Sequence, residues 1–379
     1  MLYRKFGKTN EKVSILGYGC MRLPLLPGGD PTNIDEEKAT KLIRYAIDEG
    51  VNYIDTAYPY HSKTMGSGGQ SEPFLAKALK DGYREKVKIA TKLPSWLIKT
   101  KSDLDKYLNE QLARLEIDTI DFYLVHALNK TLWKNVQEAG ITEFLDQAIK
   151  DGRIKYAGFS YHEKHEHFKE IVDNYNWSFC QIQFNYLDEN FQAGLEGLKY
   201  AAQKGLGITI MEPLRGGKLA VGLPEDVERV FSQAEVKRTP AEWALRWIWN
   251  HPEVSVVLSG MNTMEQVVEN LKVAGEANEN SLVKKELATI EQAKNIFQAR
   301  IKVNCTACGY CQPCPAWVDI PSCFNLYNNY HMFGREEGYR MIPLKQRASN
   351  CVECGKCETH CPQGILIREE LKKTKAVFE

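Results

Sequence analysis

The sequence has no excess of charge of either sign, because its 379 residues include 49 Lys and Arg and 49 Asp and Glu. This balance offers no basic surface for nucleic acid or for an anionic membrane. Long apolar runs are also missing: the longest, such as Val254–Leu258, are the size of a strand and far shorter than a membrane span. The first eight residues lack the apolar core of a signal peptide. We therefore expect a cytoplasmic protein with no nucleic-acid or membrane partner.

Cysteine is scarce in the first 300 residues, where only Cys20 and Cys180 occur, although the chain has eleven in all. The remaining cysteines follow Arg300, where the composition changes abruptly. The chain is also longer than the roughly 250–300 residues at which one hydrophobic core stops growing. These features predict a large domain at 1–280, a connecting helix at 281–300 and a small cysteine-rich domain at 301–379.

Residues 1–275 alternate between short apolar or β-branched runs and longer segments of helical period. Eight strands, each followed by a helix, predict a (β/α)8 TIM barrel. A doubly wound sheet would usually carry a GxGxxG turn after its first strand, and this sequence has none there. Residues 2–12 predict a small hairpin that closes the barrel floor. The predicted strands are 14–18, 52–54, 87–90, 121–125, 154–158, 179–182, 207–211 and 254–258, and the helical segments include 36–49, 102–115, 141–151 and 264–276.

The cysteine-rich segment contains two similar runs. Each has three cysteines at two-residue gaps, followed by a cysteine that precedes proline: Cys305, Cys308, Cys311 and Cys314, then Cys351, Cys354, Cys357 and Cys361. Three cysteines so spaced let one loop reach three corners of a cube-shaped metal cluster. Structural zinc, by contrast, normally takes cysteines in pairs. The pattern resembles that of bacterial two-cluster ferredoxins, in which the fourth cysteine of each run ligates the other cluster.

This resemblance implies a small C-terminal two-cluster ferredoxin-like domain with two [4Fe–4S] clusters. It also implies the ligand sets, which are Cys305, Cys308, Cys311 and Cys361 for one cluster and Cys351, Cys354, Cys357 and Cys314 for the other. The first run departs from the ferredoxin spacing, because only two residues separate Cys311 from Cys314. Cys323 is the alternative to Cys314. Such clusters are labile in air, which favours an anaerobic host.

Polar residues follow five of the predicted barrel strands. They are Asp55, Lys92, His126, Ser160 and Gln183, and the loop after the second strand adds Tyr60. In this fold the chemistry lies at the C-terminal ends of the strands. An ammonium group beside a phenol lowers the phenol pKa, a carboxylate keeps the ammonium charged, and a histidine can orient a carbonyl oxygen. The group therefore predicts an acid that protonates a carbonyl oxygen while hydride reaches the carbonyl carbon.

Three segments carry a family resemblance: 51–60 (VNYIDTAYPY), 90–92 (ATK) and 123–126 (YLVH). They resemble motifs of the aldo-keto reductase family, and the likeness extends over residues 1–275. The resemblance implies a catalytic tetrad of Asp55, Tyr60, Lys92 and His126, with Tyr60 as general acid. It further implies NAD(P)H-dependent reduction of a carbonyl, or the reverse oxidation of an alcohol. The whole chain resembles a prokaryotic branch that carries a ferredoxin-like domain.

The same resemblance implies the cofactor contacts. They are Ser160 and Gln183 at the nicotinamide carboxamide, Met211, Pro213, Leu214, Arg215 and Gly217 in and before the pyrophosphate loop, and Gln266, Glu269 and Asn270 in the last loop. Met211 stands where relatives often place an aromatic ring against nicotinamide. The Lys and Arg that usually clamp the 2′-phosphate of NADP fall on Gly260 and Gln266, so the NADP-specific clamp is missing.

Nicotinamide delivers two electrons together as hydride, whereas a [4Fe–4S] cluster moves one electron at a time. Three interpretations follow. The favoured one is an aldo-keto reductase whose clusters serve electron transfer or redox sensing, with a small carbonyl or alcohol substrate and a ferredoxin or other redox protein as partner. The second is a flavin enzyme that exchanges electrons between a small substrate and ferredoxin, which Met211 and the missing clamp keep open. The third is a non-catalytic iron–sulfur electron carrier or sensor, against which the tetrad argues.

Overall fold

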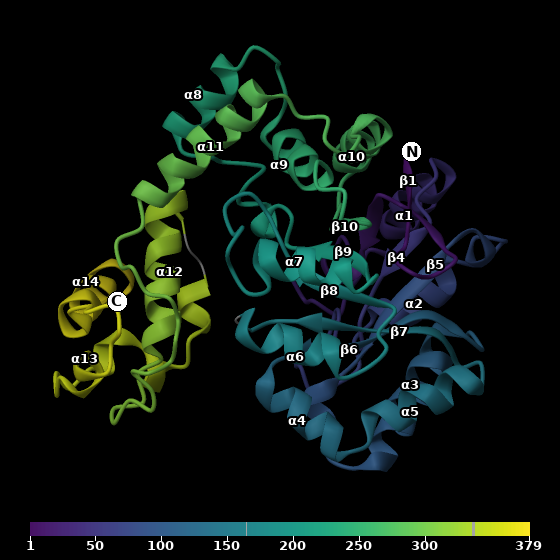
Figure 1. The fold of residues 1–379 in the computed structure, drawn as a ribbon, viewed down its shortest axis with the longest axis horizontal. Coiled ribbons are helices and arrows are strands. Elements are labelled where there is room, and N and C mark those ends of the chain that lie inside the picture. The colour runs from purple at the N-terminus through teal and green to yellow at the C-terminus, as the bar shows by residue number, and fades with distance from the viewer. Residues whose placement is uncertain (164, 336–337) are drawn as a thin grey trace. The chain divides into compact units, whose positions relative to one another are not determined.

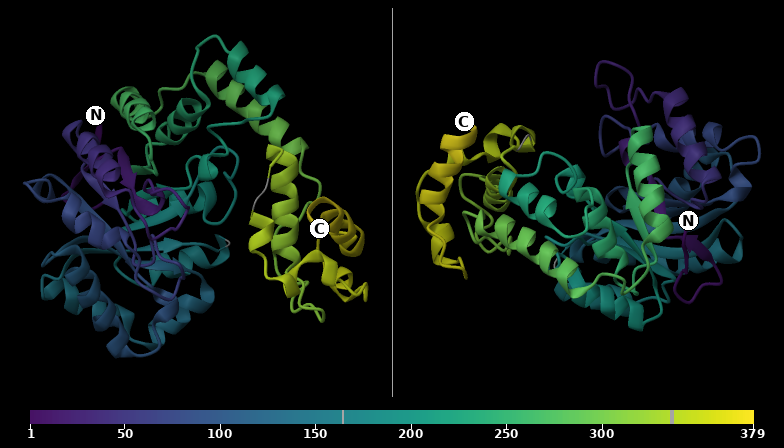
Figure 2. Two further views of the ribbon diagram at one scale, coloured as in Figure 1. Left: turned by 180° about the vertical axis from the view of Figure 1, so that it is seen from behind. Right: turned by 90° about the horizontal axis from the view of Figure 1, so that it is seen from above.

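The computed structural model describes residues 1–163, 165–335 and 338–379. The chain folds into two compact units, and each is discontinuous in sequence (Figures 1 and 2). The first unit comprises 1–217 and 241–283, and the second comprises 218–240 and 284–379. The segment 218–240, which lies between two barrel elements in the sequence, therefore folds with the C-terminal part of the chain.

The first unit is a closed barrel of parallel strands with helices around it (Figure 1). Each strand pairs with its successor in the sequence, and β10 closes the barrel onto β3. The predicted (β/α)8 barrel is confirmed, and all eight predicted strands are present. They are β3 (Leu16–Gly19), β4 (Tyr53–Asp55), β5 (Lys88–Leu93), β6 (Ile120–Leu128), β7 (Ile154–Tyr161), β8 (Phe179–Gln183), β9 (Gly207–Met211) and β10 (Val256–Ser259).

Several strands extend beyond the predicted apolar runs. Lys92, His126 and Ser160 lie inside the ends of β5, β6 and β7 rather than just after them. The ladder continues that far, since Lys92 is paired with Leu124 and Ser160 with Gln181. Backbone pairing does not depend on side-chain polarity, so the end of an apolar run underestimates the length of a strand whose last residues line the barrel mouth.

The helices around the barrel present apolar stripes at helical spacing. In α1 the buried residues are Ala39, Leu42, Ile43, Ala46 and Ile47, which lie on one face. Helices of this unit are α1 (Glu36–Asp48), α2 (Ser71–Ala78), α3 (Lys101–Leu115), α4 (Lys130–Glu138), α5 (Ile141–Lys150), α6 (Phe168–Asp173), α7 (Gly194–Gln203), α9 (Pro240–Trp249) and α10 (Met264–Glu276). Among the described residues, no helix is both long enough and apolar enough to span a membrane.

A hairpin closes the N-terminal end of the barrel, as predicted. Strands β1 (Tyr3–Lys5) and β2 (Lys12–Ser14) pair antiparallel, and Phe6 follows β1. The Phe6 ring is fully buried and lies 4.7 Å from the Phe122 ring and 5.4 Å from the Phe179 ring, centroid to centroid. Phe179 begins its strand, so Phe6 plugs the barrel interior at the end opposite the predicted chemistry.

The second unit is mainly helical. Its helices are α8 (Glu225–Gln233), α11 (Lys284–Ala299), α12 (Ile320–Phe333), α13 (Lys356–Thr359) and α14 (Ile367–Phe378). Helices α8 and α11 lie side by side although barrel elements separate them in the sequence (Figures 1 and 2). Arg300, just beyond α11, donates to both carboxylate oxygens of Asp226 at 2.7 and 2.8 Å. The predicted helix at 281–300 corresponds to α11.

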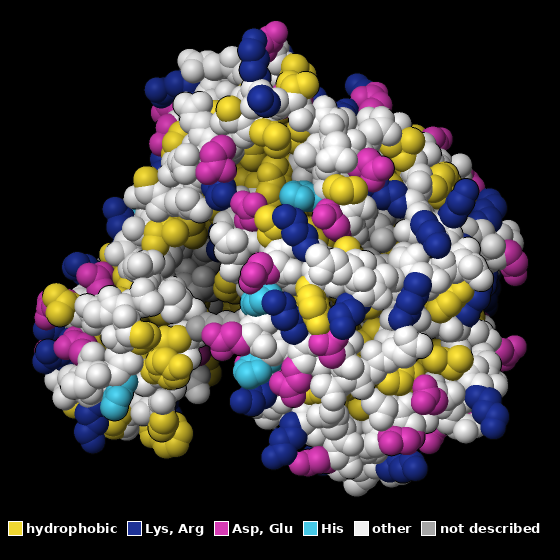
Figure 3. All heavy atoms as spheres, in the orientation of Figure 1, with side chains coloured by type: hydrophobic (Ala, Val, Ile, Leu, Met, Phe, Trp, Pro, Cys, Tyr) yellow, Lys and Arg dark blue, Asp and Glu magenta, His cyan; other side chains and the backbone are white. Residues whose placement is uncertain are grey.

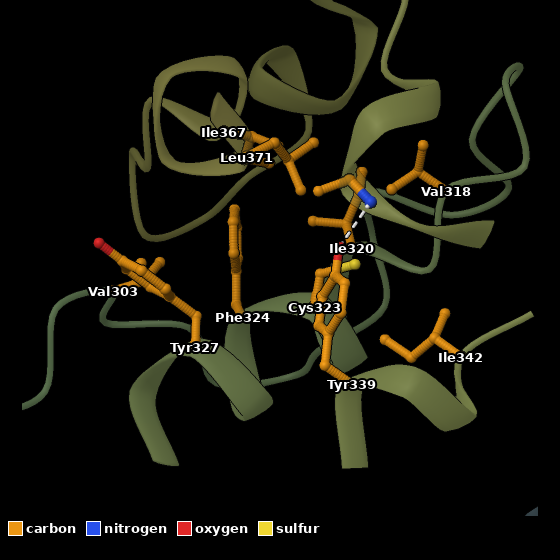
Figure 4. Packing of buried hydrophobic residues seen from close by; sticks show 11 residues of the cluster. Val303, Val318, Ile320, Cys323, Phe324, Tyr327, Tyr339, Ile342, Ile367 and Leu371 are labelled. Carbon is orange, nitrogen blue, oxygen red and sulfur yellow. Dashed lines mark hydrogen bonds between the residues drawn. The ribbon is translucent and has the colours of Figure 1, made fainter. Parts of the chain in front are cut away.

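A separate hydrophobic core supports the cysteine-rich segment (Figure 4). Phe324 and Tyr327 of α12 and Leu371 of α14 contribute to it, and the partly buried cysteines pack against it. The surrounding chain forms short 3-10 helices, η6 (Gly338–Met341), η7 (Leu344–Gln346) and η8 (Ala348–Asn350). On the face drawn in Figure 3, acidic and basic side chains are interspersed over the surface.

Replacing Phe6 by alanine should destabilise the barrel by roughly 3–5 kcal/mol, because it empties a packed site with little room to collapse. Phe191 provides the matched control, since 48% of it is exposed and its truncation should change stability little. Urea unfolding followed by tryptophan fluorescence measures both. Similar unfolding midpoints for the two variants would contradict the role of Phe6 as the plug.

Candidate active site and cysteine cavities

The four predicted catalytic residues come from three neighbouring strands and one loop. Asp55 ends β4, Lys92 lies near the end of β5, His126 lies in β6, and Tyr60 follows β4 in the loop. The three strand residues are almost fully buried: the exposed fraction is 0% for Lys92, 2% for Asp55 and 8% for His126. The fold therefore brings the predicted tetrad together at the C-terminal end of the barrel.

Lys92 is the centre of this group. Its Nζ lies 2.8 Å from both carboxylate oxygens of Asp55 and donates to the Thr56 carbonyl at 2.7 Å. The Tyr60 hydroxyl oxygen lies 3.2 Å from the same Nζ. Because an ammonium group can only donate, the Tyr60 oxygen accepts in this contact. The phenol proton of Tyr60 is left to be donated to another acceptor.

Burial and charge act against each other on these groups. Burial opposes the charged form of Lys92, but Asp55 and Tyr60 outweigh it and raise the pKa of Lys92. Burial raises the pKa of Tyr60 above its ordinary value, and the Lys92 charge offsets only part of this rise. The sequence-based expectation named only the second effect. The net direction keeps Tyr60 protonated near neutral pH, as a proton donor requires.

His126 is held by an irregularity in β6. The pairing register shifts between Val125 and Leu128, and Ala127 adopts a left-handed φ of 54°. Two hydrogen bonds hold the backbone at this irregularity. Ser95 Oγ donates to the His126 carbonyl at 2.5 Å, and Ala127 N–H donates to Ser160 Oγ at 2.7 Å.

The His126 ring lies near two aromatic rings, with centroids 6.3 Å from Tyr60 and 5.2 Å from Trp96. Its buried Nδ1 has no hydrogen-bond partner among the described residues. Burial, followed by the charge of Lys92, holds the pKa of His126 well below its usual range. The ring is therefore neutral near pH 7, so one of its nitrogens carries a proton and can donate it in a hydrogen bond.

The predicted nicotinamide contacts lie on the next strands around the barrel. Ser160 is in β7, Gln183 ends β8 and Met211 ends β9. Ser160 already accepts from Ala127, and Gln183 Nε2 donates to Asp188 Oδ2 at 3.0 Å. The mouth is thus divided, with the tetrad on β4 to β6 and the predicted cofactor residues from β7 onwards.

The predicted pyrophosphate loop is short and tightly turned. Pro213 is buried and Leu214 half-buried, and three consecutive residues follow with positive φ: Arg215 at 49°, Gly216 at 66° and Gly217 at 91°. A Cβ on Gly217 would meet nothing within 4 Å, so space remains beside the backbone there. The Arg215 guanidinium lies 3.5 Å from Asp188, so part of its charge is already balanced.

The predicted adenine-end residues lie on α10. Asn270 is buried and donates to Ser259 Oγ at 2.9 Å, while Glu269 is half-buried one position earlier. Gln266 is exposed, and its side-chain oxygen accepts from Asn262 N–H at 2.9 Å. Gln266 and Asn270 therefore support the loop that precedes α10.

Arg22 is a mouth residue that sequence reasoning missed. It ends η1 (Cys20–Arg22), immediately after β3. Its Nη2 lies 3.4 Å from Glu212 Oε1, and a Cβ on Gly260 would lie 3.4 Å from Arg22 Cβ. The aliphatic part of Arg22 therefore packs beside Gly260, while its guanidinium lies beside Glu212 and 3.4 Å from the position that a Cβ on Gly216 would take. The signal that could have found Arg22 is its position just after the first barrel strand.

Eight of the nine cysteines of the second unit line two small cavities. One is lined by Cys305, Cys308, Cys311 and Cys361. The other is lined by Cys314, Cys351, Cys354 and Cys357. In the described chain, no three of these side chains converge as ligands of a single metal ion would. Four thiols around a cavity are the donor set that an iron–sulfur cluster needs.

The two cysteine triplets share a backbone conformation. Ala307 and Glu353, at matching positions before the second cysteine, have φ of 52° and 55°. Gly309 and Gly355, just after that cysteine, have φ of 80° and 74°. This alternation curls each loop around its cavity, and glycine tolerates the second left-handed turn without strain.

Cys314 and Cys323 differ in their surroundings. Cys314 lines the second cavity with the later triplet, whereas Cys323 is fully buried in the hydrophobic core of Figure 4. Its Sγ lies 3.8 Å from the Gln346 carbonyl oxygen, and burial raises the pKa of its thiol to about 12. The geometry therefore favours Cys314 over Cys323 as the fourth cysteine of that set.

Comparisons with known proteins agree with this arrangement. The model of the aldo/keto reductase family matches residues 15–295, and the model of the 4Fe-4S dicluster domain matches 304–366. The chain is 24% identical over 327 residues to the uncharacterized oxidoreductase YqkF of Bacillus subtilis, covering 79% of this chain and 99% of that protein. It is 27% identical over 285 residues to the 6-dehydroglucose reductase of Novosphingobium aromaticivorans, covering 70% and 88%.

A similar solved structure is the holo form of the aldo-keto reductase AKR11C1 from Bacillus halodurans. It aligns with a TM-score of 0.64 and 26% sequence identity, and the alignment covers 77% of this chain and 96% of that one. Since the family model spans about three quarters of the sequence, the chain belongs to the aldo/keto reductase family and carries a C-terminal 4Fe-4S dicluster domain.

Proposed function

We propose that this oxidoreductase reduces a small carbonyl compound, or oxidises the corresponding alcohol, with a nicotinamide dinucleotide as cofactor and Tyr60 as general acid. One observation carries the proposal: the Tyr60 oxygen lies 3.2 Å from an ammonium group that is itself held by a buried carboxylate. A structural ion pair does not need a phenol as a further neighbour, whereas a phenol held in this contact can act as the acid in proton transfer to a carbonyl.

The proton balance follows from the contacts of Tyr60. In the reduction, the Tyr60 hydroxyl gives its proton to the carbonyl oxygen, which completes the alcohol. The Tyr60 oxygen then becomes a phenolate, and Lys92 stabilises it through the contact already present. Asp55 keeps Lys92 charged throughout. In the reverse direction the phenolate takes the proton from the alcohol.

His126 has a different part in the proposal. As a neutral ring it donates a hydrogen bond to the substrate oxygen and orients it toward Tyr60, without adding a second positive charge beside Lys92. The rings of Trp96 and Tyr60 are its aromatic neighbours, with centroids 5.2 and 6.3 Å away. The unpartnered Nδ1 is consistent with a ring that is not committed to a structural hydrogen bond.

The bound dinucleotide supplies the hydride. Ser160, Gln183 and Met211 are proposed to hold its nicotinamide end, and the sharply turned residues Arg215 and Gly217 its pyrophosphate. Gln266, Glu269 and Asn270 are proposed to hold the adenine end. Because Gly260 and Gln266 stand where relatives usually carry the cations, and the guanidinium of Arg22 is paired with Glu212, we propose weak discrimination between NADP and NAD.

In the second unit we propose two [4Fe–4S] clusters, one for each set of cavity-lining cysteines. A cluster supplies one-electron transfer when bound. This chemistry serves exchange with a redox protein or the sensing of redox state, since hydride transfer in the barrel moves two electrons at once.

Tyr60→Phe should lower kcat/KM for aldehyde reduction by about 10²–10⁴-fold, because the acid is removed. Binding of the dinucleotide, titrated by fluorescence, should not change. Tyr58→Phe is the control: this neighbouring hydroxyl donates to Glu110 at 3.0 Å and is not part of the tetrad. Benzaldehydes with NADPH and NADH are suitable probes. Full activity in the Tyr60 variant would refute the proposed acid.

His126→Gln should make the barrel less sensitive to acid. The pKa of a histidine in the unfolded chain is about 6.5, whereas burial and Lys92 hold that of folded His126 far lower. Below pH ~6.5 the unfolded chain therefore binds a proton that the folded chain does not. As the pH is lowered, the free energy of unfolding decreases by up to about 1.4 kcal/mol per pH unit.

Urea unfolding between pH 7 and 4.5, followed by tryptophan fluorescence, measures this pH dependence, because every tryptophan except Trp317 lies in the barrel unit. In the variant, the slope of the unfolding free energy against pH should be smaller by up to the contribution of one proton. Equal slopes for the variant and the natural protein would contradict a neutral, buried His126.

Anaerobically prepared protein should contain about eight iron and eight sulfide per chain, and Cys361→Ser about half of each. Cys323→Ser is the matched control, because Cys323 lies in the hydrophobic core and should leave the iron content unchanged. Iron and acid-labile sulfide assays check both variants. Stoichiometric zinc without sulfide would refute the clusters, and cluster loss in the Cys323 variant would refute the ligand assignment.

A further inference from the structure

A buried carboxylate lies close to the tetrad without touching it. Glu72, in the first turn of α2, is fully buried. Its Oε1 accepts from Thr91 Oγ1 and from Gln111 Nε2, each at 2.7 Å, and its Oε2 lies 2.9 Å from Arg114 Nε. Three donors from a strand and a helix thus satisfy one carboxylate. Buried carboxylates that are so well satisfied order their surroundings.

One side of this network holds the strand that carries Lys92. Thr91 immediately precedes Lys92 in β5, and Gln111 Nε2 also donates to the Lys92 carbonyl at 3.1 Å. Gln111 is itself fixed from β6, because the Tyr123 hydroxyl donates to its side-chain oxygen at 2.9 Å. The backbone position of Lys92 therefore depends on hydrogen bonds that meet at Glu72.

The other side holds the loop that carries Tyr60. Arg114, paired with Glu72, also donates through Nη2 to the Gly69 carbonyl. Gly69 packs so closely on Tyr60 that a Cβ would lie 1.9 Å from the Tyr60 carbonyl oxygen. Ser71 N–H donates to the same oxygen at 3.2 Å. Arg114 thus secures the far end of the loop against the residue that bears the proposed acid.

We propose that Glu72 is a positioning residue, which joins the backbones of Lys92 and Tyr60 through Gln111 and Arg114 and so sets the contact between their side chains. The inference rests on the proposed function for its meaning, but the network itself can be tested without catalysis. Burial raises the pKa of Glu72, and the hydrogen bonds from Thr91, Gln111 and Arg114 oppose this rise. The charge and geometry of Arg114 therefore matter to the network.

Hydrogen–deuterium exchange of the full chain, read by mass spectrometry on peptides covering 57–71, tests the proposal. Glu72→Gln and Arg114→Lys should each speed exchange there by about tenfold or more, the scale of one lost hydrogen bond to a charged group. The double variant should exchange little faster than either single variant, because both break the same connection. If the Glu72 variant fails to fold, Arg114→Lys, at a partly exposed side chain, still decides the question.

Asp121→Asn is the matched control. Asp121 also joins β5 and β6 by accepting from Ile89 N–H at 2.9 Å, and it pairs with Arg84 at 2.8 Å, but it lies at the opposite end of both strands. It should leave exchange in 57–71 unchanged. Exchange like that of the natural protein in both network variants, or equal acceleration in the control, would overturn the proposal.

A spectroscopic measurement separates positioning from general loosening. With ¹³C-labelled tyrosine, the Tyr60 signal is identified by its loss in Tyr60→Phe. In the network variants its titration should shift, because both the burial of the ring and its contact with Lys92 change, while in Asp121→Asn it should stay. An unmoved titration with faster exchange would refute the positioning role. An active Tyr60→Phe enzyme, by contrast, would refute the acid and leave the network result standing.

Discussion

The buried ion pair between Lys92 and Asp55 is the constraint on which the active end of the barrel depends. Removing two charges from water is unfavourable unless their geometry and hydrogen bonding are nearly ideal. Here the ammonium meets both oxygens of one carboxylate and a backbone carbonyl, all within 2.8 Å. Tyr60 is its fourth and most distant neighbour, at 3.2 Å. The ammonium has three protons for four acceptors, so in the proposed reaction the Tyr60 contact is the one that strengthens as the phenolate forms.

The surroundings of the pair give each neighbour a defined protonation state. Burial keeps the phenol of Tyr60 protonated despite the nearby ammonium, and burial together with that ammonium keeps His126 neutral. The site therefore holds one phenol that keeps its proton, one cation with its counter-ion and one neutral imidazole ring. That set suits a reaction in which a single proton is delivered to an oxygen whose negative charge is developing.

The second unit follows a different principle, in which a small hydrophobic core and two curled loops gather thiols around cavities. Both loops use left-handed residues at the same positions. The segment 218–240, which falls within the region matched by the reductase family model, folds into this unit through α8 and the pair of Arg300 with Asp226. The cluster-binding part is therefore not a simple appendage after the barrel, because its fold draws on a segment that interrupts the reductase sequence.

The sequence by itself determined the barrel, the polar residues at its mouth and the two cysteine runs. Each of these features is encoded by local hydrophobic periodicity or by the short spacing between residues. The eight strands and Met264–Glu276 could be predicted since burial of one face imposes its period on neighbouring residues. Only the tertiary structure decided the net pKa direction of Tyr60, the left-handed bend at Ala127 that sets His126, and the placement of Cys314 rather than Cys323 at a cavity. It also decided that Glu72, Gln111 and Arg114 meet behind Lys92. These features depend on desolvation and on contacts between residues far apart in the chain, which no local pattern of side chains encodes.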